Sequence, residues 1–111
     1  MIEEYVLNYL KSNGFNAYTE EQEDMEKDRI LFYVENVTCE NMIYSCDLNL
    51  EIYSDTLSNT VQLRDQVRDS IQAMADNIVI ANVKLNDLKL ETDTTKKRYR
   101  YFGTFNLTFY D

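Results

Sequence analysis

The sequence contains no histidine, no proline and no tryptophan, and it has only two glycines among its 111 residues. Without histidine the chain lacks the commonest general base and the commonest metal ligand, and no Ser-His or Cys-His nucleophile pair can form. Gly14 and Gly103 lie too far apart to build a glycine-rich loop that cradles a phosphate. We therefore expect that the protein is not an enzyme and that it uses no cofactor and no metal ion.

Cysteine is also scarce, and its placement argues against a disulfide or a zinc site. Cys39 and Cys46 are the two cysteines, without CxxC spacing and without a histidine to join them. Cys46 falls on the apolar side of an alternating segment, and Cys39 falls in the polar stretch before it. We expect two reduced thiols, as in an intracellular protein.

Long hydrophobic runs are absent as well. No apolar stretch approaches the ~20 residues of a membrane span, and the acidic start over residues 1–4 differs from the basic start of a signal peptide. A chain of this length is expected to form one domain, over residues 1–111.

Charge is plentiful but segregated. The net charge is −9, of which residues 1–55 carry −10 and residues 56–111 carry +1. Such a distribution suits head-to-tail contact between copies of one protein, while a solvated acidic loop and a solvated basic turn explain it equally well. The acidic cluster consists of Glu20, Glu21, Glu23, Asp24, Glu26 and Asp28, and the basic cluster of Lys96, Lys97, Arg98 and Arg100.

The middle of the chain shows two different hydrophobic periods. Apolar and polar residues alternate over 42–53, which predicts a strand with one buried face. After the polar turn 54–56, apolar residues recur with a helical period, which predicts a helix over 57–76. The apolar residues of that helical pattern are Leu57, Val61, Val67, Ile71, Met74 and Ile78.

The first half of the chain predicts three further elements. Residues 1–12 read as an amphipathic helix that Asn13-Gly14 ends. Residues 15–18 suggest a short strand, and the charged stretch 19–28 an exposed loop. A strand over 30–35 is followed by a polar turn at 36–41, so that the strand 42–53 pairs back as a hairpin.

The second half adds an outward helix face and two strands. The apolar phase slips between Leu85 and Leu88, which predicts a bulge or a short turn at Asn86-Asp87. A polar turn over 91–97 precedes a strand over 98–110, where Gly103 marks a bend or a close backbone approach. We expect the outward face of the helix to be solvated; it carries Arg64, Asp65, Arg68, Asp69 and Gln72.

These elements predict an α+β fold in the order α-β-β-α-β-β. Strands that are neighbours in sequence favour a mainly antiparallel sheet of about four to five strands, with two helices packed on one face.

Three stretches of the chain, taken in order, form a distinctive arrangement. The first is the N-terminal helix followed by Gly14-Phe15-Asn16-Ala17-Tyr18. The second is the strand 42–53 running through Ser54-Asp55-Thr56 into Leu63-Arg64-Asp65-Gln66-Val67. The third is the pair formed by Leu88–Asp93 and the aromatic strand Tyr99–Thr108. Together they resemble the tail terminator or tail-completion (minor tail) proteins of long-tailed phages and prophages. Members of that family often enter the first long strand through a proline, whereas this chain has Glu26-Lys27-Asp28-Arg29 there.

The resemblance implies a structural virion-assembly protein. Such proteins form a ring, usually a hexamer, on the last ring of the tail tube protein. The ring stops tube polymerisation and offers a surface to the head connector or head-completion protein, and DNA passes through it without specific binding. In that setting we expect the acidic loop 19–28 at a rim or lumen and the basic cluster at a subunit contact. The protein would reside in the virion, or in the cytoplasm of the bacterial host during assembly, and would not contact membrane.

Two alternatives remain at this point. One is another head–tail joining or minor virion protein. The other, from a different class, is an acidic monomeric inhibitor that mimics DNA, which the charge of the first half supports. Against it, the acidic residues cluster in one loop instead of following a helix face at phosphate-like intervals.

Overall fold

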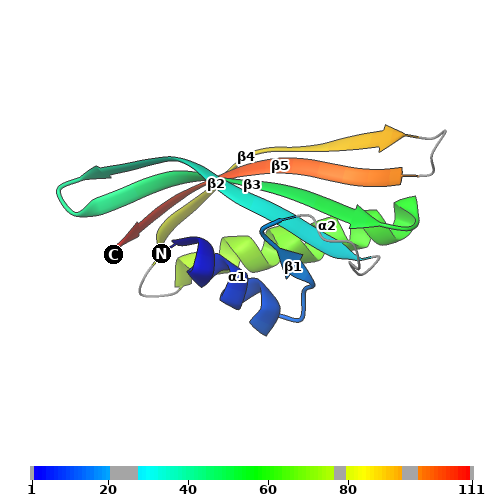
Figure 1. Ribbon diagram of the computed structural model, residues 1–111, viewed down its shortest axis with the longest axis horizontal. Helices are drawn as coiled ribbons and strands as arrows, with labels where there is room; N and C mark the ends of the chain where they lie inside the picture. Colours follow the sequence, from blue (N-terminus) through cyan, green and yellow to red (C-terminus); the bar gives the residue numbers. More distant parts are fainter. Residues whose placement is uncertain (1, 21–27, 77–79, 94–97, 111) are drawn as a thin grey trace.

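A five-stranded sheet carries both helices on one of its faces (Figure 1). The computed structural model describes residues 2–20, 28–76, 80–93 and 98–110. Across the sheet the strands follow the order β1-β2-β3-β5-β4; β1 is parallel to β2, and the other neighbours are antiparallel. This confirms the predicted α+β class. Along the chain the elements are α1 (Ile2–Ser12), β1 (Ala17–Tyr18), β2 (Arg29–Glu40), β3 (Ile43–Ser54), α2 (Leu57–Gln72), the 3-10 turn η1 (Ala73–Asp76), β4 (Ile80–Asp93) and β5 (Arg98–Tyr110).

The hydrophobic core lies between the sheet and the helices. Strand alternation sends every second side chain of the central strands toward the helices, and burial of these apolar groups is the main source of stability. From the sheet the core takes Leu48 and Leu50 of β3 and Phe105 of β5, each at most 1% exposed, and from α2 it takes Val67 and Ile71. The opposite face of the sheet, which we call the open face, carries mostly polar residues.

Both helices have the end signals that their sequences predict. After α1, Gly14 adopts a φ of +86°, and the Phe15 amide donates to the Leu10 carbonyl at 3.1 Å. This left-handed residue closes the last turn of the helix. At the start of α2, the Thr56 Oγ1 accepts from the Asn59 amide at 3.1 Å, which satisfies a backbone donor that lacks a helical partner.

Strand β2 is longer than predicted, and the turn predicted at residues 36–41 is wrong. The strand continues to Glu40 across a bulge between Glu35 and Thr38, where Asn36 has a φ of +54°. The chain reverses later, at Asn41 and Met42, whose φ values of +54° and +66° fit a two-residue hairpin turn. Residues 36–40 are mostly polar because both faces of the strand are exposed to solvent there.

Helix α2 begins at Leu57 as predicted, but the residues that it buries differ from the predicted apolar stripe. Leu57, expected in the stripe, is 44% exposed, whereas Thr60 is fully buried and its hydroxyl donates to the Thr56 carbonyl at 2.6 Å. The regular helix ends at Gln72 and continues as η1, where Met74 is buried. The predicted contribution of Ile78 lies outside the described residues.

The β4–β5 hairpin confirms the predicted phase slip. The pairing register shifts between Leu85 and Asp87, so the bulge keeps Leu85 and Leu88 on the helix side of the sheet. The strand continues to Asp93, so the predicted turn at 91–97 begins later than expected, and its remainder, 94–97, lies outside the described residues. Strand β5 covers 98–110 as predicted.

Candidate self-association surface

The sheet ends on two long outer edges. On one side, β1 pairs with β2 only at Ile30 and Leu31, so within the described residues nothing pairs with the outer edge of β2 from Phe32 to Glu40. On the other side, β4 pairs only with β5 among the described strands, which leaves its outer edge open along its length. Strand edges with unused N–H and C=O groups are ready templates for another chain.

Beyond the helices, the end of the β2–β3 hairpin projects from the body of the molecule (Figure 1). Every residue from 35 to 43 is exposed, and we call this segment the hairpin arm. Three of its apolar side chains are largely in solvent: Val37 is 52% exposed, Met42 81% and Ile43 44%. Tyr110, which pairs with Ile43, is 50% exposed. An arm of this composition is typical of a surface that meets a partner.

Met42 is unfavourable for the stability of the folded chain on its own. It holds a left-handed backbone at a turn position that favours glycine, and its side chain lies in water. We expect Met42→Gly to raise the free energy of unfolding by about 0.5–1 kcal/mol, because the left-handed strain disappears. Urea denaturation of the unassembled protein measures the change. The control Ile43→Gly, in extended backbone, should lower stability, and a loss in Met42→Gly would contradict the argument.

The open face is a hydrogen-bonded layer of amides, hydroxyls and carboxylates. Asn49 Nδ2 donates to Glu35 Oε1 at 2.8 Å, and Thr104 Oγ1 donates to Asn49 Oδ1 at 2.8 Å. Asn106 Nδ2 reaches Ser45 Oγ at 3.3 Å. Asn49 is thereby 6% exposed although it faces away from the helices. These contacts tie β2, β3 and β5 into one polar surface.

The predicted basic cluster is only partly within the described residues. Lys96 and Lys97 lie outside them, and Arg98 is described only as the first residue of β5. Arg100 points over the open face, where its Nη1 contacts Glu51 Oε1 at 3.0 Å and Tyr53 Oη at 3.3 Å. The Arg100 guanidinium thus has partners within its own chain, and a role for the cluster in contact between copies stays a prediction.

The predicted acidic loop is described only at its ends. Glu20 and Asp28 are exposed, while Glu21, Glu23, Asp24 and Glu26 lie outside the described residues. Asp28 makes two hydrogen bonds that stabilise the local structure. Its Oδ1 accepts a hydrogen bond from Ser54 Oγ, and its backbone carbonyl accepts one from Asn16 Nδ2 at 3.0 Å. It therefore joins the start of β2 to the end of β3 and to the segment before β1.

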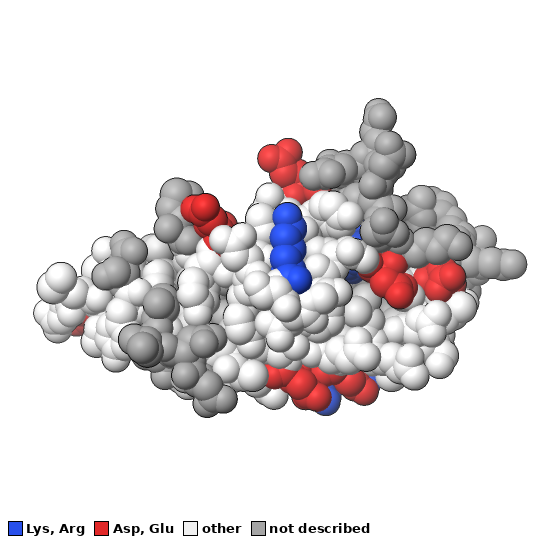
Figure 2. All heavy atoms as spheres, turned by 90° about the horizontal axis from the view of Figure 1, so that it is seen from below, with Lys and Arg blue, Asp and Glu red and all other residues white. Residues whose placement is uncertain are grey.

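Figure 2 shows the helix-covered face, where the acidic side chains drawn in red form small separate groups. A DNA mimic requires acidic groups spaced along one continuous surface, as phosphates are on a duplex. This visible face does not present such a surface among its described residues.

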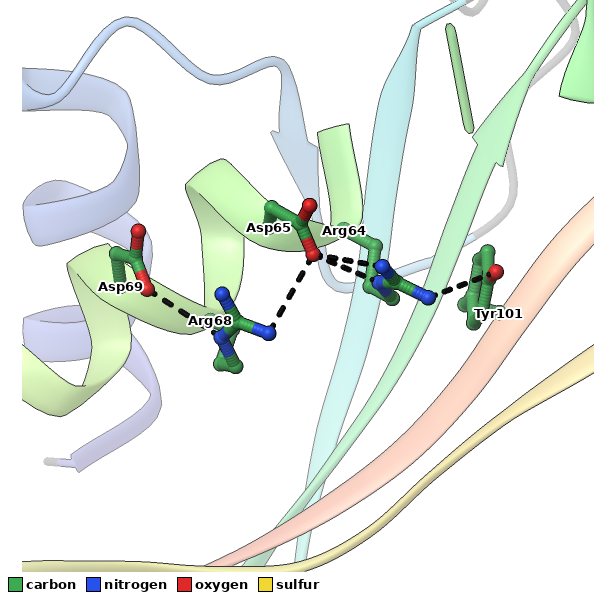
Figure 3. A network of polar contacts seen from close by, with 5 residues as sticks. All are labelled: Arg64, Asp65, Arg68, Asp69 and Tyr101. Carbon is green, nitrogen blue, oxygen red and sulfur yellow. Dashed lines mark hydrogen bonds and ion pairs between the residues drawn. The ribbon is translucent and has the colours of Figure 1, made fainter. Parts of the chain in front are cut away.

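The outward face of α2 is a connected network, which the sequence did not indicate (Figure 3). Arg64 donates to Asp65 Oδ1 from Nε at 2.9 Å, and its Nη1 donates to Tyr101 Oη at 2.9 Å. The same guanidinium stacks 4.7 Å from the centre of the Tyr101 ring. Arg68 contacts Asp65 at 3.4 Å and Asp69 at 3.3 Å. The predicted solvated face therefore also joins the helix to β5 through Arg64.

We expect Arg64→Met to lower the free energy of unfolding by about 1–2 kcal/mol, because the cation–π contact and the hydrogen bond to a nearly buried tyrosine are both lost. Arg68→Met is the matched control, since its partners are exposed carboxylates and its loss should stay within about 0.5 kcal/mol. Urea denaturation of both variants measures the difference. Equal losses would show that the Tyr101 contact is not the stabilising one.

The two cysteines have different environments. Cys39 is exposed on the hairpin arm, and Cys46 is 1% exposed in the core; both are free. Burial, followed by the charges of Asp47 and Glu3, raises the pKa of the Cys46 thiol from 9.0 to about 11. Because the folded state holds this proton more tightly, the associated stability is present below pH 9 and is lost as the pH rises toward 11.

A thiol reagent should therefore distinguish the two sites. In the unassembled native protein at neutral pH we expect one rapid equivalent, from Cys39, and a second only after denaturant is added, because the buried thiol is neutral and inaccessible. Cys39→Ser should remove the rapid equivalent. Rapid reaction of both thiols would mean that the core around Cys46 opens readily.

A groove of about 630 Å³ lies between the end of α1, the start of β2 and α2. Its lining includes Phe15, Ile30 and Leu63 with Asn16 and Ser70. Among the described residues, no group of three Cys, Asp or Glu side chains could hold a metal ion. No helix within the described ranges is long and apolar enough to cross a membrane.

Comparison with models of known protein families and with curated protein sequences finds no match to this chain.

Proposed function

We propose that this chain is a structural virion-assembly protein of the phage tail-terminator type. It would form a ring, most simply a hexamer, that caps the tail tube, stops its polymerisation and offers the attachment surface for the head connector or head-completion protein. The observation that carries the proposal is the pair of open sheet edges on opposite sides of one subunit. Two unlike edges suit a head-to-tail contact, which closes into a ring when the rotation between subunits allows it.

Two further features support this proposal. The exposed apolar side chains of the hairpin arm, Val37 and Met42 among them, are unfavourable in an isolated monomer and suit contact with a partner. The open face is polar and carries the carboxylates of Glu35, Asp47 and Glu51, and the chain has a net charge of −9. A lumen with this character would let DNA pass, because like charges repel phosphate.

The test is the assembly state, alone and with tail tubes. Light scattering on a size-exclusion column at low and moderate salt should give a ring mass, either directly or after tail tubes are added, and negative-stain images should show rings at tube ends. Rings that purify with connectors and ignore tubes would indicate another head–tail joining protein. A monomer that ignores tubes and binds a basic DNA-binding protein with salt-sensitive affinity would overturn the proposal in favour of an acidic inhibitor.

A further inference from the structure

The two open edges of the sheet run in opposite directions. Strand β2 is antiparallel to β3, β3 to β5, and β5 to β4, so β2 and β4 point opposite ways at the two sides of one sheet. When copies follow one another head to tail, β2 of one copy therefore meets β4 of the next in antiparallel orientation. Such strand addition uses backbone hydrogen-bonding groups that no described strand occupies.

Each edge carries a pair of like charges on the open face. On β2 these are Glu35 and Glu40, opposite Asp47 and Ile43 of β3. Residues five apart normally fall on opposite faces of a strand, but the bulge after Glu35 returns Glu40 to the same face.

The other edge repeats this arrangement with the opposite charge. Lys84 and Lys89 of β4 lie opposite Asn106 and Phe102 of β5, and the bulge between Leu85 and Asp87 likewise keeps both on the open face. The spacing of the two lysines along β4 is therefore the same as that of the two glutamates along β2, in residues and in rungs.

We propose that neighbouring copies join by antiparallel pairing of the β2 edge of one subunit with the β4 edge of the next, with Glu35 opposite Lys89 and Glu40 opposite Lys84. This inference rests on the proposed ring and names its contact. All four residues are exposed: the Lys89 side chain is 74% exposed, and its Nζ contacts Asp87 Oδ2 at 3.4 Å. This register places each glutamate directly opposite a lysine on one face, because a slip by one residue moves the partner to the other face and a slip by two places another residue opposite each glutamate.

Charge also argues against the symmetric alternatives. A two-fold pairing of β4 with β4 would bring two lysine-bearing edges together, and a pairing of β2 with β2 would bring two glutamate-bearing edges together. The unlike pairing instead joins opposite charges at both positions, and unlike edges produce a ring or filament instead of a closed dimer.

Two charge-reversed variants test the contact. In the first, Glu35→Lys and Glu40→Lys make both edges positive; in the second, Lys84→Glu and Lys89→Glu make both edges negative. Each alone should raise the concentration needed for half-assembly by about tenfold or more, through like-charge repulsion at every contact. Mixed in equal amounts they should assemble again, because each subunit then finds an unlike edge on both sides. For the first variant, a control with Glu4→Lys and Asp69→Lys makes the same change of net charge at exposed sites on the helices, away from both edges, and should assemble normally.

Cross-linking gives a second readout that does not depend on variants. A zero-length carbodiimide reagent on the wild-type assembly should join Glu35 to Lys89 and Glu40 to Lys84. Within one subunit these strands are three spacings apart, roughly 14 Å, so each such link must join two copies.

The outcomes separate the two proposals. If wild-type protein forms no ring with or without tubes, the proposed function and the contact both fail. If it forms rings but the charge-reversed variants, shown to be folded by circular dichroism, assemble like the wild type, the contact is wrong and the ring stands. Impairment by β4 reversal alone, with β2 reversal silent, would instead indicate that β4 contacts a surface other than the β2 edge and would overturn the inference.

Discussion

Phe105→Ala should lower the free energy of unfolding by about 3–5 kcal/mol, the largest single loss that we expect in this chain. Phe105 is 1% exposed at the centre of β5, flanked by Leu48 of β3 and Leu85 of β4. Removing its ring leaves a cavity that packed strands on both sides cannot fill. Small domains have a total stability of about 5–15 kcal/mol, so this variant should be close to unfolding at room temperature.

Phe102→Ala is the matched control for that change. It removes the same ring from the same strand, but Phe102 lies on the open face and is partly exposed. Its loss should be about 1–2 kcal/mol, because less apolar area returns to water. Equal midpoints of urea denaturation for the two variants would mean that the core does not lie on the helix side of the sheet.

Gly103→Ala should be the second large loss, about 2–3 kcal/mol, from a single added methyl group. A Cβ at this position would stand 2.6 Å from Leu88 Cδ1 and 2.9 Å from the Asp87 carbonyl oxygen. The leucine tip can rotate away, but the carbonyl belongs to the β4 backbone at its bulge and cannot move without disturbing the pairing.

A double variant separates these two contacts. Leu88→Ala in the Gly103→Ala background removes the nearer atom, so the combined loss should be smaller than the sum of the single losses. Gly14→Ala provides a comparison, since nothing lies within 4 Å of its added Cβ and only the φ of +86° is unfavourable. Thermal or urea denaturation of the four variants measures all of these effects, and strict additivity would show that Leu88 does not cause the strain.

The sequence predicted those elements whose hydrophobic period is unbroken. The alternation in β3 and β5 and the helical stripe of α1 each reflect one face against one core, so local pattern and tertiary environment agree. The bulge near Asn86 was also predictable, because Leu85 and Leu88 are out of phase in a run that otherwise alternates.

Prediction from the sequence was wrong or incomplete where tertiary contacts, and not local composition, determine the structure. Residues 36–41 are polar because the hairpin arm lies in solvent, not because the chain turns there. Arg64 is a charged residue in a charged run, and only the position of Tyr101 on β5 makes it a link between helix and sheet. The strand order and the matched edges follow from how β5 enters the sheet, which no local pattern records.

Strand β5 lies between β3 and β4, although it follows both of them in the chain. Its pairing of Tyr110 with Ile43 closes a long loop, and contacts of this kind form late and slowly during folding. Until β5 is in place, the inner edge of β3 and the whole of β4 have no neighbour in the order found here. Strand β5 thus both completes the core and positions β4. A subunit in which β5 has not yet paired cannot present the β4 edge that we propose to meet β2 of the next copy. Synthesis and folding of the subunit would therefore set the earliest moment at which copies can meet.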